Sequence, residues 1–281
     1  MHKKIVAGIV LYNPDLERLK MNIEAIECNE FVHQIVVVDN HSDNVAEAEQ
    51  LLATHTQIHL IRNTKNVGIA RALNQIAQYA TEKGATWVLT LDQDSVVPEN
   101  LIGEYQNYTN LSNVGIIACR IVDMNYGQMH TSRTEGWEYI EQCITSGSLL
   151  NLTAWKQVGG FCEELFIDGV DFDFCIRLRQ KGYKVLRTNN TYLAHEIGHG
   201  RSVKIAGRKA LVLNHTARRL YYIARNYLYI GITHGEKVKW SKEVMKRMLL
   251  VALYEKDKLS KLRHMLRGIK HALKGELGEM H

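Results

Sequence analysis

Uniformly apolar runs alternate with amphipathic stretches along the first 92 residues of the chain. The apolar runs are rich in Val, Ile and Leu, which is typical of strands buried on both faces. The stretches between them carry apolar residues at helical spacing. The predicted strands are residues 4–12, 34–40, 58–63 and 87–92, and the predicted helices are residues 16–27, 45–55 and 67–84. This alternation predicts a parallel sheet covered by helices on both faces.

The second half of the chain has a less regular pattern. The strands predicted there are residues 114–122, residues 143–152 and the first part of 183–200, and the helices are residues 171–183, 207–230 and 236–275. A loop broken by glycines follows the strand that begins at residue 183. We therefore expect an α/β fold with a Rossmann-like, mostly parallel sheet and a helical C-terminal extension.

Composition and charge also separate a large N-terminal part of the chain from a C-terminal tail. Its 281 residues are 46% hydrophobic, which is enough for one large core with a small appendage. The net charge of +5 is unevenly placed, because residues 236–281 carry twelve Lys/Arg against six Asp/Glu and the rest is close to neutral. We expect a catalytic or binding domain over residues 1–230 and a basic helical extension over residues 231–281.

Several classes of protein are disfavoured by the sequence. No apolar run approaches the length of a membrane span, and the start MHKKIVAGIV lacks the layout of a signal peptide. The five cysteines are widely spaced without a Cys-x-x-Cys pair, which is ordinary for reduced thiols. A near-neutral body without a recognisable nucleic-acid motif argues against nucleic-acid binding. We expect a cytoplasmic protein.

Polar side chains follow the predicted strands at their carboxyl ends, where open α/β sheets bind ligands. Asp92 ends the fourth predicted strand, and Gln93 and Asp94 directly follow it. Two carboxylates separated by one residue suit a hard divalent cation that phosphate oxygens also hold, although a solvated acidic turn is the plain alternative. The other polar residues at these ends are Tyr12, Asn13, Asp39, Asn40, Asn63 and Asn66. We expect a nucleotide site at this edge.

The usual phosphate-binding motifs are missing. No Gly-x-Gly-x-x-Gly follows the first strand, and the chain has no Gly-Lys dipeptide, which excludes a P-loop lysine in that pattern. A metal that bridges a diphosphate is the natural substitute, and Asp92 and Asp94 can supply its ligands. Asp39 is placed to accept a hydrogen bond from a base or a ribose. In the alternative, Asp39 and Asn40 only cap the next helix.

Residues 195–199 match the zinc-protease pattern His-Glu-x-x-His. That chemistry requires both histidines on one face of a regular helix. Here Gly198 and Gly200 interrupt the motif, and a strand-like stretch precedes it. We therefore prefer a single histidine that completes the Asp-x-Asp metal site, and we choose His195 over His199.

Three acids lie just before a predicted helix: Asp168, Asp171 and Asp173. They can serve as N-terminal caps, which the helix dipole favours. Capping alone rarely requires three acids, however. A carboxylate held at a helix start beside a nucleotide sugar can act as the general base on an acceptor hydroxyl.

Taken together, several segments resemble the family 2 glycosyltransferases with the GT-A fold, and within that family the bacterial rhamnosyltransferases of cell-surface polysaccharide assembly. The resemblance spans roughly residues 4–230. It is carried by the first strand ending in Tyr12 and Asn13, by Asp39, by Asn66 to Gly68, by Asp92 to Asp94, and by SGSLLN (146–151), VGGFCEELFIDGVDFDFCIR (158–177), AHEIGHG (194–200) and RRLYYIARN (218–226).

The resemblance implies an inverting, metal-dependent transfer of L-rhamnose from dTDP-L-rhamnose to a hydroxyl of a saccharide, often lipid-linked, in cell-wall, capsule or O-antigen synthesis. Asp171 matches the catalytic acid of the family's Glu-Asp motif, although Val170 stands in place of Glu and leaves Asp168 as a rival base. A UDP-hexose is the alternative donor. The implied donor-binding residues are Tyr12, Asn13, Asp39, Asn66, Gly68, Asp92 and Gln93, and the implied ligands of Mg²⁺ or Mn²⁺ are Asp92, Asp94 and His195.

The basic tail mixes apolar residues with Lys and Arg at helical spacing over residues 243–275. It either packs as a helical pair on the catalytic domain or lies on anionic lipids at the inner face of the cell membrane. A homo-oligomer is left open. A second set of residues either lines an acceptor diphosphate or packs: Arg218, Arg219, Tyr221, Tyr222 and Arg225.

Three further hypotheses come from other classes of protein. The first is a non-catalytic member that binds nucleotide sugar as an assembly partner. The second is a nucleotidyltransferase, but residues 8–19 lack the Gly-rich basic loop usual after its first strand. The third is a metalloprotease, for which the interrupted histidine pattern gives little support.

Overall fold

The computed structural model describes residues 4–123, 127–128, 136–195, 201–205 and 208–280. The chain forms two compact units. The first comprises Met1–Phe161 and Phe174–Glu196, and the second comprises Cys162–Asp173 and Ile197–His281.

The first unit contains the predicted parallel strands, β1 (Ile5–Leu11), β2 (Val32–Asp39), β3 (Ile58–Arg62) and β4 (Trp87–Asp92). They pair in the order β3-β2-β1-β4, all parallel. The helices between them are α1 (Leu16–Glu27), α2 (Val45–Leu52) and α3 (Ile69–Glu82). The prediction for the first 92 residues is therefore confirmed.

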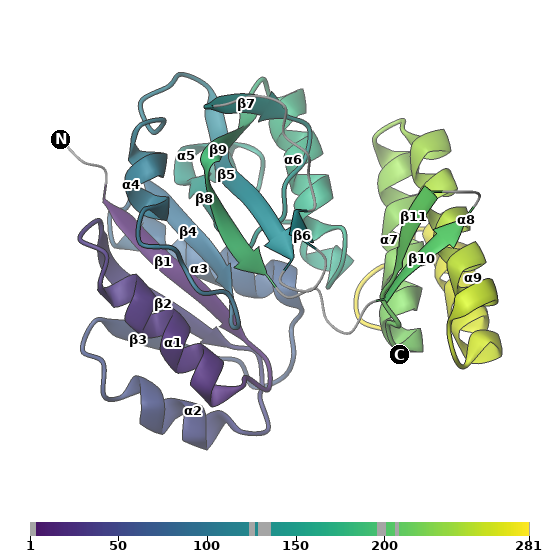
Figure 1. Ribbon diagram of the computed structural model, residues 1–281, viewed down its shortest axis with the longest axis horizontal. Coiled ribbons are helices and arrows are strands. Elements are labelled where there is room, and N and C mark those ends of the chain that lie inside the picture. Colours follow the sequence, from purple (N-terminus) through teal and green to yellow (C-terminus); the bar gives the residue numbers. More distant parts are fainter. Residues whose placement is uncertain (1–3, 124–126, 129–135, 196–200, 206–207, 281) are drawn as a thin grey trace. The chain divides into compact units, whose positions relative to one another are not determined.

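Helices cover both faces of this parallel half, as Figure 1 shows for α1 in front and α3 behind. Alternate residues of β1, such as Ile5 and Ile9, belong to one core with α1 and α2. On the opposite face, Gly8 lies so close to α3 that an added Cβ would be 2.2 Å from the Ile76 side chain. Burial on both faces explains why β1 is apolar along its whole length, whereas the edge strand β3 is only partly buried and contains His59 and Arg62.

The sheet continues past β4 with strands of mixed direction: β8 (Ser148–Asn151), β5 (Val114–Asp123), β9 (Lys184–His195) and β7 (Trp137–Ile140), with β6 (Gly127–Gln128) paired to β5. β8 is antiparallel to both β4 and β5, and β5 is parallel to β9. Three more helices are α4 (Leu101–Gln106), α5 (Leu152–Gln157) and α6 (Val170–Gln180). The first turn of α6 belongs to the second unit and the rest to the first.

The strand predicted over residues 143–152 was too long, because only Ser148–Asn151 is a strand. Gly147 has a φ of +73°, which breaks an extended run. Its N–H donates to the Thr90 carbonyl, and the Thr90 hydroxyl donates to the Thr145 carbonyl. The segment before β8 is therefore a turn tied to β4.

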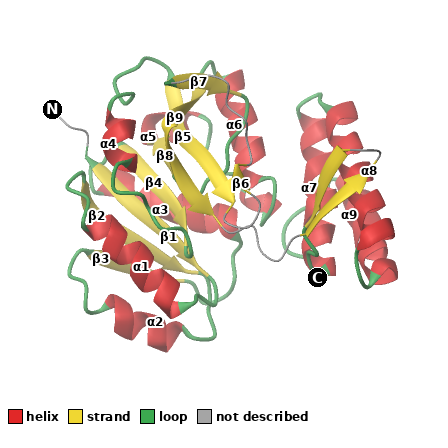
Figure 2. Ribbon diagram, viewed as in Figure 1, coloured by secondary structure: helices red, strands yellow, loops and turns green. Residues whose placement is uncertain are grey.

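The second unit consists of η1 (Glu163–Leu165), the hairpin β10 (Arg201–Ile205) and β11 (Arg208–Val212), and the helices α7 (Ala217–Thr233), α8 (Lys237–Tyr254) and α9 (Lys258–Lys274) (Figure 2). The helix predicted over residues 207–230 was partly wrong, since Arg208–Val212 pairs antiparallel with β10. The helix begins only after Thr216, whose side chain caps it by accepting from the Arg219 N–H.

The three C-terminal helices share a core of Leu220, Ile223, Ala224, Val244, Val251 and Met265. The expected boundary at residue 230 lies inside α7. Among the described residues, no helix is long and apolar enough to cross a membrane. The opposite faces of α8 and α9 expose Val238, Met245, Leu249, Leu253, Leu259, Leu266 and Leu273.

Candidate functional site

The carboxyl ends of β1 and β4 are joined through Gln93. Its Oε1 accepts from the Tyr12 N–H at 2.8 Å, and its Nε2 donates to the Tyr12 carbonyl at 3.3 Å. The Tyr12 ring is about half exposed. The structure therefore brings two predicted site residues together and leaves an aromatic surface at the edge of the sheet.

Asp39 ends β2 and is only 2% exposed. Its carboxylate accepts from the backbone N–H groups of His41 and Ser42 at 3.2–3.3 Å. The N-cap residue of α2 is Asn44, so the hypothesis that Asp39 caps this helix is wrong. The carboxylate instead orders the loop after β2.

The loops after β1 and β2 are fastened to each other. Asn13, which has a φ of +50°, donates its N–H to the Ser42 hydroxyl at 2.9 Å. The Asn13 side-chain oxygen accepts from the Asp43 N–H at 2.7 Å. An αL conformation at Asn is tolerated because its short side chain can form such local hydrogen bonds. Asn13 therefore contributes to the shape of this edge.

A chain of amides leads from β2 to the start of α3. Buried Asn40 donates to the Asn66 side-chain oxygen at 3.0 Å and accepts from the Val67 N–H at 2.9 Å. The same oxygen of Asn66 accepts from the Gly68 N–H. Gly68 has a φ of +83° immediately before α3, which explains the glycine. Predicted residues Asn66 and Gly68 thus lie at a helix start that Asn40 organises.

The backbone of Asp92 is held on both sides. Its N–H donates to the Ser146 hydroxyl at 3.1 Å, and its carbonyl accepts from the side-chain amide of Asn22 in α1 at 3.0 Å. The hydroxyls of Ser146 and Ser95 are 2.8 Å apart, and both residues are buried. The side chains of Asp92 and Asp94 are partly exposed on this rigid support.

The donor set at this turn fits a hard divalent cation. Asp92 and Asp94 offer carboxylate oxygens, which Mg²⁺ and Mn²⁺ prefer, and Mg²⁺ typically takes one or two carboxylates together with waters and substrate phosphates. In the described part of the chain no three His, Cys, Asp or Glu side chains gather as a closed metal site. A cation here would therefore depend on ligand oxygens as well as on the protein.

The structure describes only the backbone of His195. His195 is the last residue of β9 and pairs with Asp123. Because a zinc-protease motif requires a helix at this histidine, its strand conformation disagrees with that interpretation. Glu196 and His199 lie outside the described residues.

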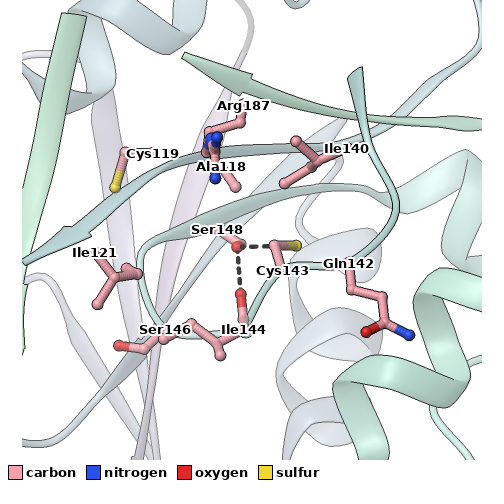
Figure 3. Close-up of a pocket in the computed structure, with 10 residues that line it drawn as sticks. All are labelled: Ala118, Cys119, Ile121, Ile140, Gln142, Cys143, Ile144, Ser146, Ser148 and Arg187. Atoms are coloured by element: carbon pink, nitrogen blue, oxygen red, sulfur yellow. Dashed lines mark hydrogen bonds between the residues drawn. The ribbon is translucent and has the colours of Figure 1, made fainter. Parts of the chain in front are cut away.

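A small pocket opens beside Ser146, between β5, β8 and β9 (Figure 3). The hydroxyl of Ser148 donates to the Ile144 carbonyl at 2.6 Å and lies 3.7 Å from the Cys143 sulfur. Burial raises the pKa of the Cys119 thiol to about 11, so that thiol is protonated and inert at neutral pH. The pocket therefore borders Ser146, whose hydroxyl accepts from the Asp92 N–H.

In the second unit, the three predicted acids have different partners. The Asp168 carboxylate accepts from the Arg219 guanidinium at 3.2–3.3 Å, and burial raises the pKa of Asp168 while Arg219 opposes that rise. Asp173 is buried with its Oδ1 2.8 Å from the His234 Nε2. Asp171 lies in the first turn of α6, is partly exposed, and accepts from the Phe172 N–H.

The sequence left two roles open for a set of five residues, either lining an acceptor diphosphate or packing. Three of the five are buried. Arg225 has no exposed surface, and its guanidinium lies over the rings of Tyr221 and Tyr222 at 5.4 and 5.0 Å. Both tyrosines are also buried. Burial therefore argues against an acceptor site at these three residues, whereas Arg218 and Arg219 are about half exposed and paired with Glu279 and Asp168.

Sequence reasoning missed the residues that support the site. Asn22 lies on the apolar face of α1 between Leu19 and Ile26, and a polar residue in an apolar stripe is a signal that could have found it. Ser146 belongs to the SGSLLN segment, whose resemblance was noted without a role. Their bonds to Asp92 join positions 70 and 54 residues apart, which no local pattern reveals.

Comparison with known proteins then decides the family. The family model described as Glycosyl transferase family 2 matches residues 8–165. This chain belongs to that family. A curated relative, the dTDP-rhamnosyl transferase RfbF of Shigella flexneri, is 30% identical over 99% of this chain and 97% of its own length.

Solved structures show the fold. A mannosyltransferase from Pyrobaculum calidifontis, solved with GDP-Man and Mn²⁺, has a TM-score of 0.60 at 14% identity and covers 100% of this chain and 77% of its own. GalNAc-T7, solved with UDP, GalNAc and Mn²⁺, has a TM-score of 0.66 at 13% identity and covers 97% of this chain, which spans 56% of that protein.

The protein is therefore a family 2 glycosyltransferase of GT-A fold that resembles bacterial rhamnosyltransferases. Membership of this family replaces the nucleotidyltransferase and metalloprotease hypotheses. Family membership also establishes that the protein is an enzyme that uses a nucleotide-sugar donor. The hypothesis of a non-catalytic assembly partner is therefore set aside.

Proposed function

We propose that this enzyme transfers L-rhamnose from dTDP-L-rhamnose to a hydroxyl of a saccharide acceptor in the synthesis of a bacterial cell-surface polysaccharide. The assignment of the donor rests on the 30% identity to a dTDP-rhamnosyl transferase over nearly the whole of both chains. A UDP-hexose is the competing donor, because the base-binding edge has no residue that distinguishes thymine from uracil by its chemistry alone.

The edge of the parallel sheet is the proposed donor site. In this proposal the base would bind beside Asp39 at the end of β2, and Tyr12 would offer its half-exposed ring just after β1. Asp92 and Asp94, with His195 as a further ligand, would hold Mg²⁺ or Mn²⁺. Such a cation supplies charge stabilisation to the departing diphosphate. Asn13, Asn66, Gly68 and Gln93 shape the loops around the donor.

Asp171 is the proposed general base. Its carboxylate takes the proton of the acceptor hydroxyl as that oxygen forms a bond to C1 of the sugar, and the bond from C1 to the diphosphate breaks with inversion. A single carboxylate suffices, since the leaving group is a diphosphate and does not need a second acid as in glycosidases. Asp168 is the less suitable base because Arg219 already occupies its oxygens.

The Asp171→Asn variant tests the base and the donor together. We expect dTDP release from dTDP-L-rhamnose, in the presence of saccharide and lipid-diphosphate-linked saccharide acceptors, to fall by at least about a hundredfold, a typical cost of losing a general base. The donor Kd, measured by thermal shift with and without Mn²⁺, should stay within about threefold, since binding to the native state raises the melting temperature.

The control is Asp168→Asn, which removes an acid from the same loop. If Asp171→Asn retains turnover while Asp168→Asn is inactive, the base assignment passes to Asp168. A thermal shift with UDP-glucose, UDP-galactose or GDP-mannose in place of dTDP-L-rhamnose would replace the donor while keeping the family.

We also infer that the exposed faces of α8 and α9 lie on anionic lipid, which would bring the enzyme to a lipid-linked acceptor. Leu259, Leu266 and Leu273 recur every seven residues on α9 and are 86%, 57% and 62% exposed. Arg263, Arg267 and Lys270 lie beside this stripe at helical spacing. An apolar stripe flanked by basic residues is typical of interfacial helices. A second copy of the chain is the competing occupant.

A further inference from the structure

The segment between η1 and α6 has a strained backbone. Phe166 and Asp168 have φ angles of +65° and +62°, and Gly169 follows with +80°. Residues with side chains rarely adopt this region, and such strain persists only where surrounding contacts enforce it. The strained segment leads directly into the first turn of α6, which carries Asp171.

Two buried side chains of α7 enforce this conformation. The Asn226 amide nitrogen lies 2.8, 2.7 and 2.8 Å from the carbonyl oxygens of Leu165, Ile167 and Asp168, so its two N–H groups are shared among three acceptors. Arg225 donates through Nη2 to the Leu165 carbonyl at 3.1 Å and through Nε to the Asn226 side-chain oxygen at 2.8 Å. Neither residue has exposed surface. Three carbonyls therefore converge on one amide group that Arg225 orients.

The contacts on either side of Asn226 come from the same stripe of α7. A Cβ added to Gly169 would lie 2.9 Å from the Ile230 side chain, so the segment is pressed against the helix. One turn further, His234 meets Asp173 at 2.8 Å. Positions 219, 226, 230 and 234 are spaced by seven, four and four residues, which places them on one face of a helix. This face of α7 therefore holds residues 165–173 in place.

We propose that Asn226, oriented by Arg225, is a positioning residue for Asp171. It fixes the carbonyls of residues 165–168 and thereby sets the direction of the first turn of α6 and the place of the Asp171 carboxylate. The inference rests on the proposed role of Asp171 as base. Nothing in Asn226 itself titrates or reacts, so its effect must appear in the rate of the chemical step and not in donor binding.

The test compares Asn226→Ala with Asn151→Ala in the full-length enzyme. Asn151 is a matched control, because its amide caps α5 and donates to the Val114 carbonyl in the first unit. Both variants should lose thermal stability, since hydrogen-bond partners that are buried around Asn226 and part-buried around Asn151 lose a donor or acceptor. Asn226→Ala should lower kcat by about thirtyfold or more with the donor Kd within about threefold, as expected for a displaced catalytic group. Asn151→Ala should keep kcat within about twofold.

Two further variants keep the test decisive if Asn226→Ala does not fold. Asn226→Ser retains one donor and should recover part of kcat, and Arg225→Lys keeps the charge but loses the planar fork and should give an intermediate loss. A folded Asn226→Ala or Asn226→Ser enzyme with wild-type kcat, beside an inactive Asp171→Asn enzyme, overturns the positioning role alone. An active Asp171→Asn enzyme overturns the base assignment instead.

Discussion

At the scale of single residues, buried polar side chains determine where the chemistry-bearing groups point. Asn22 and Ser146 hold the backbone of Asp92 from two different elements. Asn226 gathers three carbonyls before α6. A buried polar group without a partner costs about 1–3 kcal/mol, so each of these positions tolerates few alternatives.

Ser146→Ala should weaken metal-dependent donor binding. The change removes the hydroxyl that accepts from the Asp92 N–H and contacts the Ser95 hydroxyl, which loosens the turn that carries both carboxylates. We expect a loss of about 1–3 kcal/mol in the free energy of unfolding and a rise in the donor Kd with Mn²⁺ of about fivefold or more. Ser148→Ala is the control, since it removes an equally buried hydroxyl that bonds only the Ile144 carbonyl and the Cys143 sulfur. Equal donor affinities in the two variants would show that Ser146 does not serve the site.

At the scale of elements, the loop between β11 and α7 contains a histidine whose pKa is strongly lowered. His215 lies between β11 and α7, partly buried, and its pKa falls from the ordinary value of 6.5 to about 3. Burial is the largest cause, followed by the positive charges of Arg219, Arg247 and Lys261. The histidine is therefore neutral in the folded protein throughout the physiological range.

This lowered pKa gives stability a direction with pH. Between pH 6.5 and 3 the unfolded chain binds a proton at His215 that the folded protein does not, so stability falls as the pH falls through that window. The slope is at most about 1.4 kcal/mol per pH unit, less for solvent screening. Urea unfolding at pH 7 and pH 5 should show that His215→Gln loses less stability on acidification than wild type, whereas the exposed His33→Gln matches wild type. Parallel losses in all three proteins would rule out this contribution.

At the scale of the whole molecule, the basic charge of the tail and the exposed apolar residues of α8 and α9 occur together. The same helices bury their other faces against α7. The tail therefore packs within its own unit and still presents an apolar face, and its binding to lipid stays a prediction.

Replacing Leu259, Leu266 and Leu273 together by Ser should weaken binding to vesicles of phosphatidylglycerol and phosphatidylcholine by about tenfold or more, since each leucine loses its apolar contribution on insertion. Binding of the wild type should fall with added salt, as expected for basic residues near anionic lipid. The control is Met21→Ser, which removes an exposed apolar residue of α1. If the triple variant instead changes from an oligomer to a monomer in sedimentation, with vesicle binding unaltered, the face belongs to a second copy of the chain.

Much of the architecture could be predicted from the sequence. Uniformly apolar runs and helical spacing correctly indicated the parallel strands and the helices of the first 92 residues, because burial on both faces leaves a local pattern. The placement of Asp92 at the end of β4 and of Asp94 just beyond it followed from the same pattern. The end of α6 was also readable from the sequence, because Gly182 just beyond it has a positive φ, a conformation that glycine adopts without strain.

Only the tertiary structure decided how the site is supported. The antiparallel pairing of β8 with β4 and the bonds from Ser146, Asn22 and Asn226 join segments far apart in the chain. A local pattern records which face of a strand or helix is buried, but not which distant donor meets a given carbonyl. The sequence by itself therefore determined the elements and the residues able to do chemistry, whereas the partners that orient those residues depend on long-range packing.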